Sequence, residues 1–308
     1  MRKLLLFSGV LVVLYISITW FFSSLILHTP DRDIATVYQM NQERWSLDLD
    51  SLLQTLPVPE DISFESPHDG IELKGWLFQP DTVRCGVVMA HGYSVNRANM
   101  LKYAPIFDSC GCALLLYDHR GHGTSSPDSY GSGGYHEATD LMAASAFLRQ
   151  ETGLPMHKIG WYGESWGGAT VILAAERAAE KPAWIVAESP FDSWESAIME
   201  RGLKDYGNAL KILTPGAFGW AGWRGEFDFD EIRPVEAASR LEVPLLLFHS
   251  QADTLTGPVQ SDNIAAATPR ELLTYHPLDW GAWHAHNIIW RRDEYTRLVL
   301  DFVGDFCE

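Results

Sequence analysis

Five short apolar runs, separated by stretches of helical character, constrain this chain more than any other feature. They lie at residues 87–90, 113–117, 159–162, 184–187 and 244–248. Short runs of this kind suit strands that are buried on both faces, and their alternation with helices is typical of parallel pairing. The sequence therefore predicts an α/β fold with a mostly parallel central sheet flanked by helices.

Other segments complete this picture. Residues 61–66 and 71–78 alternate apolar and polar side chains around a His-Asp-Gly turn, which is the pattern of a hairpin. A β-like run at 271–275 and an amphipathic helix around 295–306 close the chain. Between about 194 and 241 the alternation stops, and we interpret this stretch as a cap insertion. It contains Phe218, Trp220 and Trp223.

The N-terminal segment is of a different kind. Residues 4–27 carry no charge, and as a helix they would extend about 36 Å, enough to cross a hydrocarbon core of about 30 Å. We expect a transmembrane signal anchor. A cleaved signal peptide is the alternative, although its apolar region usually has about 7–15 residues and ends in small residues. Arg2 and Lys3 precede the segment, so the positive-inside rule predicts a cytoplasmic N-terminus and an extracytoplasmic main domain.

These boundaries divide the chain into an anchor at 1–28, a connector at 29–57 and a main domain at 58–308. The net charge is −17. Nucleic acid is therefore not expected as a partner, because nucleic-acid binding needs a basic surface. The expected partners are the membrane, through the N-terminal helix, and a small-molecule substrate.

The cysteines are too few for a disulfide scaffold in a chain of this length, and their spacing matches no metal site. In an extracytoplasmic domain, Cys85 could pair with Cys110 or Cys112, because each of them opens one of two neighbouring predicted strands. Small buried thiols at the strand starts are an equal alternative. The remaining cysteine is Cys307.

The segment Gly163-Glu-Ser-Trp-Gly-Gly follows one predicted strand directly and precedes a helix-prone stretch. A strand, a sharp turn and a helix in this order would raise the hydroxyl of Ser165 above the sheet as a nucleophile. Gly163 and Gly167 would allow close backbone approach, and the helix N-terminus would favour a developing negative charge. The alternative is an ordinary glycine-rich turn.

A second turn, His91-Gly-Tyr-Ser, follows the predicted strand at 87–90. A backbone N–H of this turn could join that of Trp166 in an oxyanion hole, and Tyr93 is the candidate donor. The alternative is a plain turn at the end of a strand.

The chain resembles the α/β-hydrolase superfamily, and within it the branch similar to lysophospholipases and serine aminopeptidases. The resemblance covers roughly residues 59–306. It depends on the order of the segments His91-Gly-Tyr-Ser-Val-Asn-Arg, Asp118-His-Arg-Gly-His-Gly-Thr-Ser, Gly163-Glu-Ser-Trp-Gly-Gly, His249-Ser-Gln-Ala-Asp and Ala282-Trp-His-Ala.

This resemblance implies an acid after the penultimate strand, here Asp253, and a histidine after the last strand, here His284 or His286. His284 is preferred because the surrounding Ala-Trp-His-Ala fits the pattern of the family. A turn-forming role for Asp253 is the alternative. The family more often has Val-Pro soon after this aspartate, whereas residues 254–258 intervene here, so the geometry of the loop is open. The His-x-His pair has no second ligand pair at zinc spacing.

These residues predict a serine hydrolase with the catalytic triad Ser165, His284 and Asp253, acting on carboxylic esters, including lipid-like acyl esters or thioesters. Such chemistry needs no cofactor. The alternatives are a peptidase or amidase of the same fold, and a membrane-anchored interaction protein that has kept the fold without catalysis.

Overall fold

The computed structural model describes residues 2–30, 32–126 and 128–307. Its centre is an eight-stranded sheet with the strand order β1-β2-β4-β3-β5-β6-β7-β8. The strands are β1 (Glu60–Glu65), β2 (Glu72–Phe78), β3 (Cys85–Ala90), β4 (Cys112–Tyr117), β5 (Ile159–Glu164), β6 (Ile185–Glu188), β7 (Leu245–Ser250) and β8 (Leu273–Leu278).

Strand β2 runs antiparallel to both of its neighbours, β1 and β4, and the other neighbouring strands are parallel. The predicted hairpin is β1 and β2, and the five apolar runs overlap β3 to β7. The prediction of a mostly parallel sheet with an antiparallel start is therefore confirmed. The β-like run at 271–275 overlaps β8, which begins two residues later than predicted, at Leu273.

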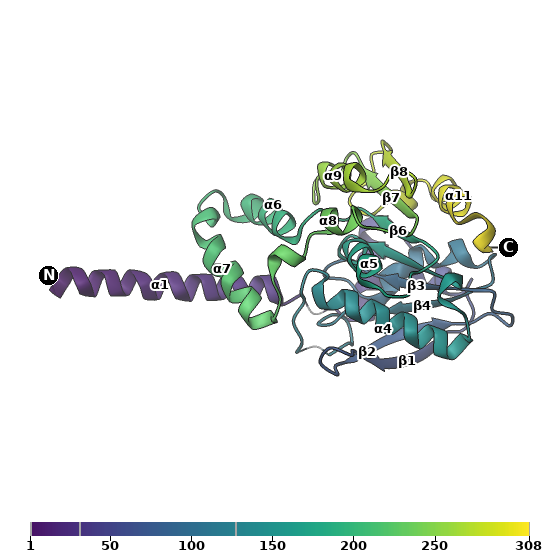
Figure 1. Cartoon of the computed structure of the whole chain (residues 1–308), viewed down its shortest axis with the longest axis horizontal. Coiled ribbons are helices and arrows are strands. Elements are labelled where there is room, and N and C mark those ends of the chain that lie inside the picture. Colours follow the sequence, from purple (N-terminus) through teal and green to yellow (C-terminus); the bar gives the residue numbers. More distant parts are fainter. Residues whose placement is uncertain (1, 31, 127, 308) are drawn as a thin grey trace.

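The side chains of β3 show how both faces of the sheet are covered. Val88 and Ala90 pack into the apolar cluster under α4 (Tyr135–Thr152) and α5 (Trp166–Arg177), which lie in front of the sheet in Figure 1. Val87 and Met89 pack into a second cluster, because successive side chains of a strand point to opposite faces. That cluster includes side chains of η1 (Arg97–Lys102), η2 (Ala104–Phe107), α10 (Asn287–Trp290) and the closing helix α11 (Arg292–Val303).

The interval interpreted as a cap contains α6 (Trp194–Tyr206), α7 (Leu210–Gly225), η4 (Phe229–Glu231) and α8 (Pro234–Ala238). The apolar N-terminal segment is one helix, α1 (Arg2–Leu27), which projects from the domain with α7 alongside it (Figure 1). Leu5 is 67% exposed at the projecting end, whereas Leu27 is fully buried at the other end. The remaining elements are η3 (Met156–Lys158), α9 (Val259–Ala267) and η5 (Gly304–Cys307).

The segment interpreted as a polar connector is largely helical. It holds α2 (Ile34–Trp45) and α3 (Leu49–Leu53). The side chain of Asp33 accepts a hydrogen bond from the N–H of Thr36 (2.8 Å), and Asp48 caps α3 in the same way through Ser51 (3.0 Å). Both helices contact η1, so this segment covers part of the second face of the sheet.

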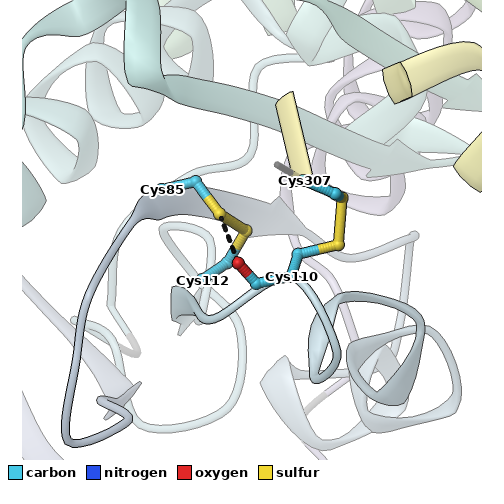
Figure 2. The surroundings of a disulfide bond; sticks show 4 residues. All are labelled: Cys85, Cys110, Cys112 and Cys307. Carbon is cyan, nitrogen blue, oxygen red and sulfur yellow. Dashed lines mark hydrogen bonds between the residues drawn. A yellow bond between two sulfur atoms is a disulfide. The ribbon is translucent and has the colours of Figure 1, made fainter. Parts of the chain in front are cut away.

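The cysteines form two disulfides, Cys85–Cys112 and Cys110–Cys307 (Figure 2). Cys85 and Cys112 are directly opposite in the parallel pair of β3 and β4, with a Cα–Cα distance of 4.4 Å. One of the two pairings considered from the sequence is therefore present, and the interpretation as buried thiols was wrong. The bond from Cys110 to Cys307 was not anticipated, because it ties the sheet to a C-terminal segment whose position the sequence did not indicate.

Candidate active site

Ser165 lies in the turn between β5, which ends at Glu164, and α5. Its backbone has φ +53° and ψ −112°, a conformation that costs energy for a residue other than glycine. A Cβ atom at Gly163 would collide with the carbonyl of Gly167, and a Cβ at Gly167 would collide with the carbonyl of Ala90. The turn therefore has the tight strand-to-helix geometry that the sequence indicated.

Three predicted residues meet at this turn. The Nε2 atom of His284 is 2.7 Å from Oγ of Ser165, and its Nδ1 atom is 2.6 Å from Oδ2 of Asp253. His284 lies in the loop between β8 and α10, and Asp253 follows β7. The sheet brings these distant residues together because its parallel strands all end at one edge.

Asp253 forms a turn with one carboxylate oxygen and contacts His284 with the other. Its Oδ1 atom accepts hydrogen bonds from the N–H groups of Leu255 (2.8 Å) and Thr256 (3.0 Å), so that it does form a turn. Its Oδ2 atom faces His284 and also lies 3.2 Å from Nε2 of the buried His249. The residues that intervene before Pro258 thus hold the carboxylate rather than displace it.

The electrostatics of the histidine and the aspartate are coupled. Burial alone would lower the pKa of His284, but the charge of Asp253 and the hydrogen bond to it raise the pKa above its usual value. Burial would raise the pKa of Asp253, yet His284 and His249 together hold it well below the usual range. The carboxylate therefore stays ionised and favours a protonated imidazole.

The neighbouring histidine, His286, has a different environment. Its Nδ1 atom contacts the carbonyl oxygen of His284, and its ring lies 4.1 Å from the ring of Trp45, between centroids. Burial lowers its pKa to about 3. His286 lines the same cavity, but its described hydrogen bond is to the backbone and not to the serine.

Tyr93 and Trp166 line the same cavity as Ser165. Their rings are stacked, with centroids 5.7 Å apart. Within the described chain, the backbone N–H groups of both residues make no hydrogen bond to another protein group. Both N–H groups are thus free for a ligand. The indole of Trp166 is buried and faces the cavity beneath Trp194.

A buried polar network supports the turn from below, and sequence reasoning missed it. Lys102 is 2.5 Å from Glu164 and also donates a hydrogen bond to the carbonyl of Ala285 (3.1 Å). Asn99 donates to Glu164 (2.8 Å), and Asn41 of α2 donates to Asn99 (3.1 Å). The network connects the connector segment to both the serine turn and the histidine loop. The one sequence signal for it was a lysine with apolar neighbours on both sides, Met100 and Leu101 before it and Tyr103 and Ala104 after it.

Two histidines of the loop at 118–125, His119 and His122, pack against His91 at the end of β3. His91, His119 and His122 form a buried cluster, and burial lowers the pKa of His91 to about 4 and of His122 to about 3. Within the described residues, no three His, Cys, Asp or Glu side chains are grouped as ligands of a metal ion would be.

A cavity of about 900 Å³ lies over Ser165. Its wall includes Phe22 and Leu25 of α1, Trp45 of α2 and Phe218 of α7. Phe218 is one of the three aromatic residues noted in the cap interval, and the other two do not line the cavity: Trp220 packs on Trp20 of α1, and Trp223 is 70% exposed. The contributions of α1 and α2 were not predicted, because they come from packing between distant segments.

Comparison with known proteins supports the observed fold. The family described as serine aminopeptidase, S33, matches residues 81–217. The uncharacterized protein YqkD of Bacillus subtilis is 28% identical over 99% of this chain and 98% of its own length. A thiohydrolase of Aspergillus aculeatus is 33% identical, but over only 35% of this chain and 34% of its own.

Solved structures share the fold at lower identity. An esterase of Pyrococcus furiosus has a TM-score of 0.68 at 20% identity and covers 90% of this chain and 97% of its own. An acylaminoacyl peptidase of Pyrococcus horikoshii has a TM-score of 0.61 at 19% identity, covering 82% of this chain and 43% of its own.

These similarities and the turn at Ser165 show that the chain has the α/β-hydrolase fold. The part of the chain at 81–217 is similar to the serine aminopeptidase, S33, family, and the proteins that share the fold include esterases and peptidases.

Proposed function

We propose that this chain is a membrane-anchored serine hydrolase that cleaves carboxylic esters or thioesters. The observation that carries the proposal is the hydrogen-bonded series from Ser165 through His284 to Asp253 at the base of the large cavity. In this arrangement the imidazole can take a proton from the serine, and the carboxylate fixes its tautomer.

The proposed reaction has two stages. Oγ of Ser165 attacks the carbonyl carbon of the ester while Nε2 of His284 takes its proton, and the N–H groups of Tyr93 and Trp166 stabilise the oxyanion. The imidazolium then gives the proton to the leaving alcohol or thiol, which leaves an acyl group on Ser165. Water, activated by the same imidazole, hydrolyses this acyl-enzyme and restores the serine.

The lining of the cavity favours an ester over a peptide with a free amino terminus. An aminopeptidase needs a free carboxylate to bind the substrate's amino group. The acidic side chains that line the described cavity are Glu164 and Asp205. Glu164 is paired with Lys102 at 2.5 Å, and Asp205 with Arg201 at 2.7 Å. Both carboxylates are therefore already engaged by a protein cation.

We also propose that residues 1–28 remain as an anchor, that 29–57 connect it to the catalytic domain at 58–308, and that this domain is extracytoplasmic. The helix from Leu5 to Leu27 is long and apolar enough to cross a membrane, although a signal sequence would have the same properties. The two disulfides support an oxidising compartment, where such bonds persist. Extraction of the full chain from membranes by detergent but not by alkaline carbonate would support the anchor. Mature protein that begins after Leu27 would contradict it.

A serine-directed fluorophosphonate probe tests the enzymatic proposal. We expect the wild-type protein to be labelled and Ser165→Ala not to be. The matched control is Ser94→Ala, which changes a serine of the other turn beside the cavity and should leave labelling intact. Absence of labelling in the folded wild type would favour a non-catalytic interaction protein.

The apolar wall supports an apolar acyl chain, and this is tested by ester length. Burial contributes about 0.8 kcal/mol per methylene, so kcat/KM should rise about two- to fourfold per CH₂ until the cavity is full. The measurement compares acetyl, butyryl, octanoyl and palmitoyl esters on the detergent-solubilised full chain. A profile that peaks at acetyl would instead indicate a small-ester hydrolase.

A further inference from the structure

The cap helix α7 packs along the C-terminal half of α1. The hydroxyl of Tyr15 donates to the carbonyl of Ile212 (3.3 Å), and Trp20 meets Trp220 with ring centroids 5.3 Å apart. Contacts at higher residue numbers in α1 match higher numbers in α7, so the two helices run parallel. A small residue, Gly216, lies against α1 between these contacts, as is common where membrane helices pack closely.

A charged side chain at this interface, Arg224, is held on both sides. Arg224 donates hydrogen bonds to the hydroxyls of Ser23 (2.7 Å) and Ser24 (2.8 Å) and lies over the ring of Trp20, 4.4 Å from its centroid. It also approaches the hydroxyl of Tyr130 (3.3 Å). This end of α7 is therefore next to the polar surface of the domain, and Ile212 lies toward the projecting part of α1.

The length of α1 makes this packing significant. A spanning helix must cross a hydrocarbon core of about 30 Å. The part of the apolar helix that α7 does not accompany, residues 5–14, extends only about 15 Å at 1.5 Å per residue. If α1 spans a membrane, its C-terminal half must lie in the lipid as well, together with the helix packed on it.

The composition of α7 suits that environment. Residues 212–223 carry no charge, and the side chains that point away from the protein are apolar at both ends of this stretch. Ile212 is 71% exposed and Trp223 is 70% exposed. Exposed apolar side chains of this size on a helix beside a candidate membrane span mark a lipid-facing surface.

The same helices form a wall of the cavity over Ser165. Phe22 and Ile26 of α1 and Tyr206, at the end of α6, line it, and the rings of Phe22 and Tyr206 meet with centroids 5.1 Å apart. This wall of the cavity therefore lies beside the outer surface of α1 and α7.

We infer that α7 is embedded in the lipid leaflet beside the C-terminal half of α1, so that the cavity opens next to the acyl chains of membrane lipids. This deepens the proposed function and rests on the anchor proposed above. The lipid bilayer covers the exposed face of α7, and the substrate is a lipid ester from that leaflet.

Site-directed fluorescence in liposomes tests this inference. All described cysteines are paired, so a single introduced cysteine can be labelled selectively without reductant. The full chain carries the fluorophore at Ile212→Cys or Trp223→Cys, with Leu11→Cys as the reference inside α1 and Val58→Cys, 92% exposed on the domain, as the reference in water. None of these residues lines the cavity, and each variant is first checked for an unchanged thermal midpoint.

Phosphatidylcholine brominated in its acyl chains then acts as a contact quencher. We expect Ile212→Cys to be quenched like Leu11→Cys, Trp223→Cys to be quenched less because it lies nearer the headgroups, and Val58→Cys to be unaffected. Quenching at Leu11 without quenching at Ile212 would overturn the inference, and cysteine cross-linking at Ile212 in that case would assign the face to a second copy. A lack of quenching at Leu11 would instead overturn the anchor itself.

Discussion

The sheet edge that carries Ser165 and the wall that covers the cavity above it are built in different ways. At the edge, Ser165, Asp253 and His284 each follow a strand, and hydrogen bonds of 2.6 and 2.7 Å hold them together. In the wall, segments that are far apart in the chain meet mainly through aliphatic side chains and aromatic rings. The contact of Phe22 with Tyr206 is an example.

Because of this difference, we expect the sheet edge to determine the chemistry and the cavity wall to determine substrate selectivity. A polar site at strand ends depends on local turns and on the common direction of parallel strands, so short motifs encode it. A wall of helices depends on which distant surfaces are complementary, and no short motif records that. Changes at the sheet edge should therefore abolish turnover, whereas changes in the wall should alter stability and substrate choice.

The largest effect should follow from changes at the sheet edge. We expect Ser165→Ala and His284→Ala each to lower kcat by about 10⁴-fold or more, and the double variant to be little worse than either, because the residues act as a unit. His286→Ala is the matched control and should keep most activity, since its ring packs on Trp45 instead of the serine. Steady-state kinetics measures all four variants. Loss of activity in His286→Ala alone would show that His286, and not His284, is the base.

The network below the site should matter more for stability than an exposed ion pair. Lys102→Met leaves the buried carboxylate of Glu164 without its cation, which typically costs about 3–5 kcal/mol in the free energy of unfolding. Lys74→Met, which removes an exposed pair with Glu72, should cost at most about 1 kcal/mol. Denaturant unfolding compares them, and equal losses would mean that the network is not needed.

Much of the sheet edge could be predicted from the sequence. The strands, the hairpin and the turn at Ser165 follow from apolar periodicity and glycine spacing, and the structure brings His284 rather than His286 to the serine. The supporting contact from Lys102 to the carbonyl of Ala285 could not be predicted, because it joins residues in contact only after folding.

The cavity wall was predicted less well than the sheet edge. Residues 29–57 were interpreted as a connector, yet Trp45 from this segment lines the cavity. The position of α7 along α1 has no signal in periodicity, because both helices are apolar around most of their circumference. The sequence indicated an anchor and a cap as separate parts, and their contact is a property of the tertiary structure.

The two halves of α1 should differ in their contribution to stability. Leu27 is fully buried in the core, so Leu27→Ala should lower the free energy of unfolding by about 2–5 kcal/mol. Leu11, 50% exposed, is the matched control, and Leu11→Ala should have little effect in detergent. Deletion of residues 2–14 should for the same reason be tolerated better than deletion of residues 2–28. Equal thermal midpoints for the two leucine variants would show that α1 does not pack on the domain.

The smallest effect is a shift in the pH profile. The imidazole of His284 must be neutral to act as a base, so kcat/KM should be highest above its raised pKa and fall as the pH drops through it. Asp253→Asn removes the charge that raises this pKa, and the acidic limb of its residual activity should move to lower pH. His286→Ala should leave the profile unchanged, since the pKa of His286 is already about 3. An acidic limb that stays in place in Asp253→Asn would contradict this coupling.

The most direct test of the account is to find the acyl group on the enzyme. The full chain in detergent is mixed with an octanoyl ester, quenched in acid during the first turnover, digested and analysed by mass spectrometry. We predict that the peptide containing Ser165 gains the mass of one octanoyl group, and that Ser165→Ala neither forms this adduct nor hydrolyses the ester. Hydrolysis by Ser165→Ala at the wild-type rate, or an adduct on another residue, would contradict the central claim.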